Sequence, residues 1–317
     1  MPTIHTVTGP IDTSQLGFTL MHEHVFVLSE GVVTNFPRLW PREERMREAT
    51  AELRAAKEHG VSTIVDLTVL GLGRDVATVR EVAKASGMQV IVATGLYTYD
   101  ELPHYFQSRD ADVMAEQFVQ DIEQGIQGTD IRPAILKCAT DQQGVTQGVE
   151  KVLRAVARAH RRTGVPISTH THAASEQGLR QQDIFEQEGV DLGRVIIGHS
   201  GDSEDIAYLE KLIGRGSYIG MDRFGIDTML PTEKRVATIA KLCERGHAGK
   251  MVLSHDASCH IDWFDPALVK QAVPRWNFLH IPDDVVPALR AAGVSDADVR
   301  TMTVENPRRI FEAHGAY

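Results

Sequence analysis

The stretch "FTLMHEHVF", residues 18–26, has the composition of a buried β-strand interrupted by three ionisable residues. An open doubly wound sheet that binds a nucleotide needs a glycine-rich turn directly after its first strand. "MHEHVF" bears no resemblance to such a turn. This stretch therefore favours the other common α/β architecture, a closed barrel, in which polar side chains gather where the strands end.

The rest of the chain repeats the same kind of segment at regular spacing. The other predicted strands are 62–68, 89–95, 133–139, 165–172, 194–200, 217–223 and 250–256. Several are continuous apolar runs, which is typical of parallel strands buried on both faces. Helical patterns lie between them, at 42–59, 75–86, 112–124, 146–163, 175–189, 204–213 and 232–245. Strands and helices in this alternation predict an α/β fold, a single (β/α)₈ TIM barrel over residues 1–317.

A long segment, 257–295, follows the eighth predicted strand and contains Trp263 and Phe264. Connections of this length in a compact domain are usually functional or carry a helix of their own. We expect that helix at residues 283–292.

Charge and cysteine content exclude several classes of protein. The chain has 33 basic and 43 acidic residues and a net charge of −10, which argues against a partner nucleic acid or membrane surface. Its three cysteines fit neither a metal knuckle nor a disulfide framework, and suit a reducing compartment. No signal peptide and no apolar run of membrane-spanning length are apparent, so we expect a cytoplasmic protein.

Catalytic groups of a (β/α)₈ barrel project from the carboxyl ends of its strands. In the first strand, His22 and His24 share one face, with Cα atoms about 6.6 Å apart. Two imidazoles at this spacing can converge on one metal ion. Glu23 faces the other way and is a poor candidate for a ligand.

Other strands end in similar groups. His170 and His172 share a face of the fifth strand, so spacing does not choose between them. His199 ends the sixth strand, and the eighth ends in His255-Asp256, of which only one residue faces the barrel axis. Asp256 could serve as both ligand and proton acceptor. Any one of these histidines alone would more often be a core residue, but their convergence at one rim favours a metal site.

Lys137 stands inside a short apolar strand, in "RPAILKCATD" (132–141). Burial disfavours the charged form of a lysine and can lower its pKa to roughly 5–6. A structural ion pair, or a side chain that snorkels to solvent, would be the ordinary explanations. A third explanation is that Lys137 carries a neutral amine with a chemical role.

Six motifs, in order along the chain, carry a family resemblance. They are "HEH" (22–24), "ILKC" (135–138), "STHTHA" (168–173), "IIGHS" (196–200), "GMDRFG" (220–225) and "LSHDAS" (253–258). Together they resemble the phosphotriesterase family of the amidohydrolase superfamily. Within it, "TGLYTYD" (94–100), Arg223, Cys259 and Trp263 are most similar to the phosphotriesterase-like lactonases.

The resemblance implies a centre of two divalent metal ions. One ion would be held by His22, His24 and Asp256, and the other by His170 and His199. Lys137, as an N-carboxylated lysine, would bridge the two together with a hydroxide. Zn²⁺ is the expected metal, with Co²⁺, Mn²⁺ or Fe²⁺ as alternatives. The resemblance places His172 at a variable position, and it implies a homodimer.

The expected reaction is hydrolysis of N-acyl homoserine lactones and other γ- or δ-lactones, with organophosphate triesters as a side activity. Hydroxide would attack the carbonyl, and Asp256 would pass the proton to the leaving alkoxide. Tyr97 would contact the lactone, while Tyr99 and Arg223 would order the pocket. Trp263, Phe264 and Cys259 would line a channel for the acyl chain. The alternatives without a catalytic role are packing at the rim for Tyr97 and a structural clamp for Arg223. For Trp263, Phe264 and Cys259, the alternative is packing within the loop itself.

Two other functions remain open at this point. The enzyme could be a primary phosphotriesterase or carboxylesterase, because the same metal ions would polarise either substrate. It could also be a barrel that binds a small ligand without catalysis, although no expected ligand position is missing from the sequence.

Overall fold

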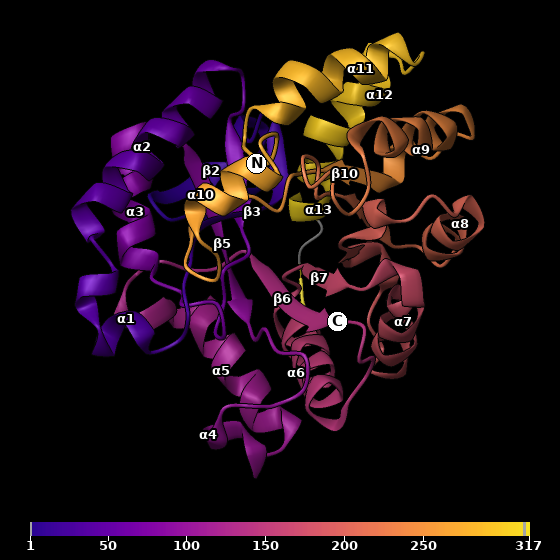
Figure 1. The fold of residues 1–317 in the computed structure, drawn as a ribbon. Helices are drawn as coiled ribbons and strands as arrows, with labels where there is room; N and C mark the ends of the chain where they lie inside the picture. The colour runs from indigo at the N-terminus through magenta and orange to yellow at the C-terminus, as the bar shows by residue number, and fades with distance from the viewer. Residues whose placement is uncertain (1, 313–314) are drawn as a thin grey trace.

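The computed structural model describes residues 2–312 and 315–317 and contains a curled parallel sheet surrounded by helices (Figure 1). The eight predicted strands are all present, and neighbours in the chain pair with each other. They are β3 (Thr19–Val27), β4 (Thr63–Asp66), β5 (Gln89–Gly95), β6 (Ile135–Thr140), β7 (Ile167–Thr171), β8 (Val195–Ile197), β9 (Tyr218–Met221) and β10 (Met251–Leu253). The predicted barrel-type fold is confirmed.

Seven helices lie where helical spacing predicted them and cover the outside of the sheet. They are α2 (Arg42–Glu58), α3 (Val76–Ser86), α5 (Ala111–Gln124), α6 (Gln147–Thr163), α7 (Gln177–Gln187), α8 (Ile206–Gly214) and α9 (Thr232–Glu244). Helix α6 illustrates why the ends of these helices could be predicted from the sequence. The Thr146 side chain accepts a hydrogen bond from the Val149 amide at its start, and Gly164 ends it with φ of 74°.

The remaining helices are short and lie in the loops and near the end of the chain. They are α1 (Val32–Asn35), α4 (His104–Gln107), α10 (Pro266–Ala272), α11 (Val286–Ala291), α12 (Asp296–Arg300) and α13 (Asn306–Glu312). The helix expected at 283–292 is a π-helical turn at Ile281–Val285 that continues into α11. In the described part of the chain, no helix is both long and apolar enough to cross a membrane.

Three strands were not predicted. β1 (Thr3–Thr6) and β2 (Gly9–Asp12) form an antiparallel hairpin. β11 (Ser258–Ile261), inside the long segment after β10, pairs in parallel with β3. The segment between β10 and β11 closes the barrel, because the Asp256 amide donates to the His22 carbonyl over 3.0 Å and the His24 amide donates to the Ala257 carbonyl over 2.8 Å.

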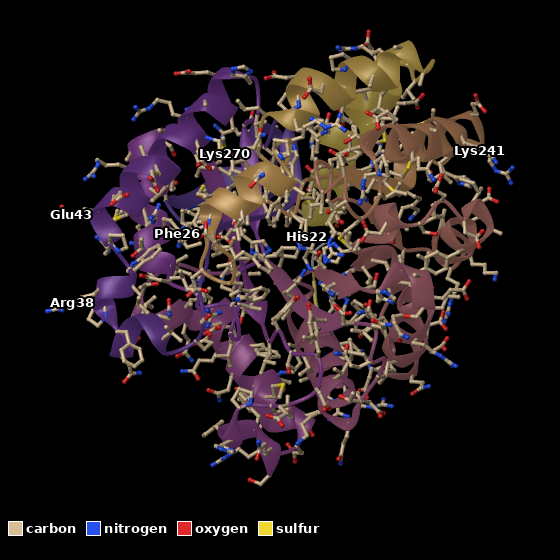
Figure 2. The ribbon with its side chains drawn as sticks, viewed as in Figure 1. His22, Phe26, Arg38, Glu43, Lys241 and Lys270 are labelled. Carbon is tan, nitrogen blue, oxygen red and sulfur yellow. The ribbon has the colours of Figure 1, made fainter. Side chains whose placement is uncertain are left out.

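The interior of the barrel is apolar below the strand ends and polar at them. Met21, Ile135 and Ile196 belong to one buried apolar cluster. Ile135 and Lys137 share a face of β6, so Lys137 continues the interior layer towards the rim. Figure 2 shows His22 near the middle of the molecule, whereas Arg38, Glu43 and Lys241 lie at its periphery.

Candidate metal centre

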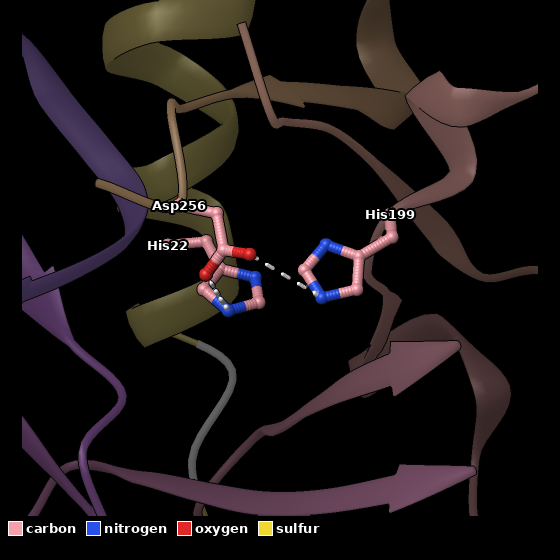
Figure 3. Close-up of side chains that lie close together, drawn as sticks. All are labelled: His22, His199 and Asp256. Carbon is pink, nitrogen blue, oxygen red and sulfur yellow. Dashed lines mark ion pairs between the residues drawn. The ribbon is translucent and has the colours of Figure 1, made fainter. Parts of the chain in front are cut away.

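Three side chains from distant parts of the chain meet at the carboxyl ends of the strands (Figure 3). His22 Nε2 lies 3.3 Å from Asp256 Oδ1, and His199 Nε2 lies 3.7 Å from Asp256 Oδ2. One potential ligand atom from each of the three lies within 4.8 Å of the others. The group can therefore hold a metal ion without rearrangement of the backbone.

The backbone at this rim is strained. His199, Arg223 and Asp256 directly follow or lie just beyond β8, β9 and β10, and their φ values are 56°, 63° and 54°. The left-handed conformation costs a residue with a side chain roughly 1–2 kcal/mol. Such strain persists only where the surrounding contacts hold it, and it concentrates at functional sites.

Two further histidines extend the group on either side. His24 Nε2 lies 3.3 Å from Asp256 Oδ1, and His170 Nδ1 lies 2.9 Å from His199 Nε2. His172 is not part of it, since its Nδ1 contacts the Ser175 hydroxyl over 2.7 Å at the edge of the barrel. The structure thus selects His170 from the pair that spacing left open.

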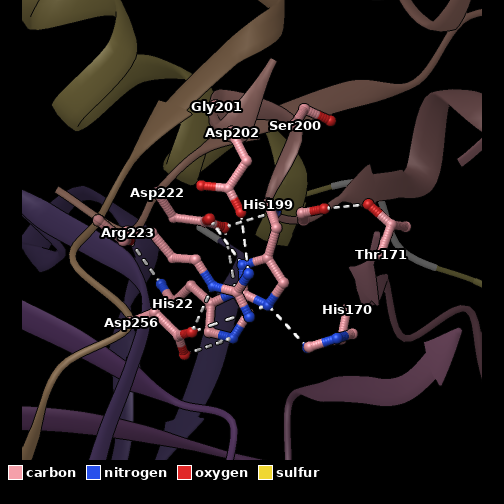
Figure 4. A network of polar contacts seen from close by, with 12 residues as sticks. His22, His170, Thr171, His199, Ser200, Gly201, Asp202, Asp222, Arg223 and Asp256 are labelled. Carbon is pink, nitrogen blue, oxygen red and sulfur yellow. Dashed lines mark hydrogen bonds and ion pairs between the residues drawn. The ribbon is translucent and has the colours of Figure 1, made fainter. Parts of the chain in front are cut away.

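The outer nitrogens of these rings contact oxygen acceptors. His22 Nδ1 and His199 Nδ1 lie 3.2 and 2.8 Å from the two oxygens of Asp222 (Figure 4). His170 Nε2 lies 2.7 Å from Asp141 Oδ2. A carboxylate only accepts, so each outer nitrogen carries the proton. Burial lowers the pKa of His199, and burial lowers the pKa of His170 to about 4, so both rings are neutral at pH 7.

The inner nitrogens, which are Nε2 of His22 and His199 and Nδ1 of His170, are therefore unprotonated, and each presents a lone pair. His170 Nδ1 and His199 Nε2 face each other over 2.9 Å with no proton to share. Two such lone pairs repel unless a cation lies beside them. Metal-ligating histidines characteristically donate their other nitrogen to a carboxylate in this way. The donor set fits a metal centre.

Lys137 lies fully buried beside His22, with Nζ 2.9 Å from His22 Nε2. Burial lowers its pKa to about 8, although Asp256 and Asp222 oppose the shift. A side chain that is 0 % exposed does not snorkel to solvent. No salt bridge to Lys137 is formed within the described residues, which removes the other ordinary explanation.

Arg223 holds the outer oxygen of Asp256. Its Nε donates to Asp256 Oδ2 over 3.1 Å, and its Nη1 donates to Asp202 Oδ2 over 2.8 Å (Figure 4). Asp202 is held in turn by the fully buried Arg235 over 2.7 Å. Burial alone would raise the pKa of the Asp256 carboxyl, yet that pKa lies well below its usual value, and the charged Arg223 guanidinium is among the groups that stabilise the ionised form.

A cavity of about 200 Å³ opens above these groups. Tyr97 projects into it, with its hydroxyl 3.5 Å from His170 Nδ1, and that hydroxyl also contacts Tyr99. The lining is largely apolar and consists of Val27, Leu72, Ile226, Met229, Ile261, Trp263, Phe264 and Trp276, beside Tyr97, Tyr99, Arg223, Ser258 and the candidate ligands. The cavity suits a small, mostly apolar molecule with one polarisable group.

Cys259 does not line this cavity, contrary to the sequence-based expectation. It lies in a second cavity of about 370 Å³ beside Glu52. Its neighbour Ser258 lines both cavities, and the Ser258 hydroxyl is buried without a hydrogen-bond partner in the described chain. β11 was not predicted, so the placement of Cys259 in the second cavity could not be expected from the sequence.

Sequence reasoning also missed the carboxylates behind the histidines. Asp222 accepts from His22 Nδ1, His199 Nδ1 and the His199 amide, and Asp141 accepts from His170. Asp222 lies near the end of the predicted strand 217–223, and Asp141 lies just beyond the predicted strand 133–139, which was a usable signal. Their partners, however, come from other strands, and only the closed barrel brings them together.

Comparisons with known proteins agree with this architecture. Residues 2–311 match the model of the phosphotriesterase family. A phosphotriesterase homology protein of Mycobacterium tuberculosis is 55% identical, covering 100% of both chains. An aryldialkylphosphatase of Saccharolobus solfataricus is 43% identical over 95% of this chain and 96% of that protein. A solved structure described as the phosphotriesterase from Mycobacterium tuberculosis superposes with a TM-score of 0.97, 55% identity and 100% coverage of both chains.

Proposed function

Because the chain belongs to the phosphotriesterase family, we propose that it is a metal-dependent hydrolase of ester bonds whose preferred substrates are lactones. One observation carries the metal dependence: the unprotonated nitrogens of His170 and His199 face each other over 2.9 Å beside Asp256. Those nitrogens need a cation between or beside them. A bound metal pair would supply a hydroxide nucleophile and polarise the carbonyl of the substrate.

The ligand set of the proposal divides into two groups. His22, His24 and Asp256 would hold one ion, and His170 and His199 the other. Lys137 lies next to the first group, is buried and forms no salt bridge within the described residues, which supports its carboxylation and a bridging role. Zn²⁺ is the first candidate, and Co²⁺, Mn²⁺ and Fe²⁺ prefer similar donors.

Residues of the chain then handle the proton and the substrate. Asp256 would accept the proton of the attacking water and return it to the leaving alkoxide, while Arg223 keeps its outer oxygen oriented over 3.1 Å. The hydroxyl of Tyr97 projects into the cavity, where it would contact the lactone ring. Tyr99 orients Tyr97 through the contact between their hydroxyls.

Preference for lactones over triesters rests on the resemblance of residues 94–100, Arg223 and Trp263 to lactonases. The apolar side chains of Trp263 and Phe264 line the mouth, where they would pack against an acyl chain. The relative named aryldialkylphosphatase supports triester hydrolysis as the second candidate activity. A homodimer is proposed on the same resemblance.

The test compares kcat/KM for acyl homoserine lactones, γ- and δ-lactones, aryl esters and phosphotriesters on one preparation of measured metal content. We expect at least one lactone class to exceed every triester. A triester preferred over all lactones would make the protein a primary phosphotriesterase. Bound metal without hydrolysis of any ester would support a ligand-binding barrel instead.

A further inference from the structure

The middle residue of "HEH" has no part in the chemistry described above. Glu23 is 0 % exposed, and its side chain points away from the cavity. Its Oε1 accepts from the His255 amide over 2.9 Å and from His255 Nδ1 over 2.7 Å. Its Oε2 accepts from the Ala257 amide over 2.9 Å. One carboxylate thus binds the amides on both sides of Asp256.

Asp256 itself is the strained residue of this turn, with φ of 54°. Its amide donates to the His22 carbonyl over 3.0 Å, and the Ala257 carbonyl accepts from the His24 amide over 2.8 Å. All three residues of the motif therefore hold the turn: His22 and His24 by their backbone, and Glu23 by its side chain. The contacts oppose relaxation of the left-handed backbone, which would redirect the Asp256 carboxylate.

His255 fixes Glu23 from behind. Its Nε2 accepts the Ile281 amide proton over 2.9 Å, so its own proton lies on Nδ1 and is donated to Glu23. The His255 carbonyl accepts from Trp276 Nε1 over 2.9 Å. Residues 276–281 begin with Trp276, which lines the cavity. They are thereby connected through His255 to the Glu23 carboxylate.

We propose that Glu23 is a positioning residue: by clamping the amides of His255 and Ala257, it aims the Asp256 carboxylate at His22 and His24. The inference rests on the proposed function only in that Asp256 is taken as a metal ligand. The clamp itself is a property of the chain without metal and can be measured without it. A metal ligand held by its backbone in this way needs little reorganisation when the ion binds.

Glu23→Gln is the most direct variant. A glutamine keeps the volume but replaces one acceptor oxygen by an NH₂ donor, which would face an amide N–H. Glu23→Asp keeps the carboxyl group and is one methylene too short to reach both amides. The matched control is Asp121→Asn on α5, since Asp121 accepts from Arg74 over 3.0 Å and Thr94 over 2.6 Å away from the rim.

Two measurements on the metal-free protein and one on its reconstitution form the test. Amide exchange of His255 and Ala257 should accelerate about tenfold in Glu23→Gln, as expected for one lost hydrogen bond, and stay unchanged in Asp121→Asn. Binding of the first Zn²⁺ should weaken about 10- to 100-fold in Glu23→Gln and Glu23→Asp. Circular dichroism should show the same helix content in all four proteins.

The outcomes separate the possible failures. Unchanged exchange at both amides, or wild-type zinc affinity in Glu23→Gln, overturns the positioning role. Equal losses in Glu23→Gln and Asp121→Asn show a general loss of stability and also overturn it. If the wild type binds no metal and hydrolyses no ester, the proposed function fails, while the exchange data still decide whether Glu23 clamps the turn.

Discussion

His170 Nδ1 lies 2.9 Å from His199 Nε2, and each ring bonds a carboxylate with its other nitrogen. The carboxylates Asp141 and Asp222 thereby fix both tautomers with the lone pairs inward. In the metal-free protein this pair is repulsive. Binding of a metal ion would require no change of tautomer in this arrangement.

Metal removal should therefore cost both activity and stability. We expect about two ions per chain by elemental analysis, and loss of hydrolysis after dialysis against a chelator. An ion present at about 1,000 times its Kd adds about 4 kcal/mol to the free energy of unfolding, so Tm should fall on removal and recover with Zn²⁺. Full activity in protein shown to be free of metal would contradict the proposed centre.

Lys137→Ala removes the proposed bridge. We expect loss of at least one of the two ions and a large fall in kcat/KM, because the remaining ligands hold the ions without a shared anion. Bicarbonate with a short carboxylic acid should restore part of the activity by occupying the space of the side chain. The carbamate itself should appear in the wild type as a ¹³C resonance after growth or reconstitution with labelled bicarbonate. A variant that keeps two ions and full activity unaided would exclude the bridge.

Asp222→Asn tests the support behind both halves of the site. Asp222 accepts from His22 Nδ1, His199 Nδ1 and the His199 amide, and an asparagine would present a donor to one of these N–H groups. Affinity for both ions should fall about 10- to 100-fold. Competition with a chromogenic chelator measures this directly, with Asp121→Asn as the control. Wild-type affinity would mean that the imidazoles keep their orientation without the carboxylate.

Residues at the strand ends show which parts of the candidate site could be predicted from the sequence alone. His22 and His24 share a face by the period of two, and Lys137 was anomalous in any apolar strand, so these residues could be found without a structure. Spacing did not choose between His170 and His172, and the family resemblance named His170. The role of Asp222 became apparent only in the closed barrel. β11 was invisible because it pairs with β3, more than 230 residues earlier in the chain, and short polar strands have no distinctive local pattern. Cys259 lies on that strand and lines the second cavity, not the first.

Ser258→Ala tests whether substrate satisfies an unpartnered hydroxyl. The Ser258 hydroxyl is buried in the cavity wall without a partner among the described residues. Since no protein hydrogen bond is lost, Tm should stay the same or rise slightly. KM for lactones should rise about tenfold if the hydroxyl bonds the substrate, which corresponds to about 1.4 kcal/mol. An unchanged KM across the lactone panel would show that Ser258 lines the cavity without forming a hydrogen bond to the substrate.

Tyr317→Phe tests a contact remote from the site. The Tyr317 hydroxyl lies 2.7 Å from His160 Nε2 and accepts from the Asp191 amide over 2.6 Å. Because His160 Nδ1 donates to the Val165 carbonyl, Nε2 is the acceptor, and the tyrosine donates to it. The variant should lose about 1 kcal/mol of unfolding free energy in urea melts, with kcat/KM unchanged. A loss of activity without loss of stability would contradict this purely structural role.

The same contact predicts a pH dependence of stability. Burial lowers the pKa of His160 below 6.5 in the folded protein, so the unfolded chain binds the proton more tightly. The contribution of His160 to the free energy of unfolding should therefore be fully present above pH 6.5 and decrease as the pH drops below this value. His160→Gln should flatten this part of the urea-derived profile between pH 7 and 5. A profile as steep as that of the wild type would assign the slope to other histidines.

β11 returns the chain to β3 immediately after Asp256, and the remaining loop leaves only beyond Ile261. Changes in length or composition within residues 263–275 should therefore leave the backbone contacts of the Asp256 turn in place, whereas Trp276 and Ile281 contact His255 directly. Such changes should alter the wall of the cavity where Trp263 and Phe264 lie without moving the backbone around Asp256. A laboratory graft of the segment should begin after residue 261, because a graft that begins at 257 would carry away part of the closure of the barrel.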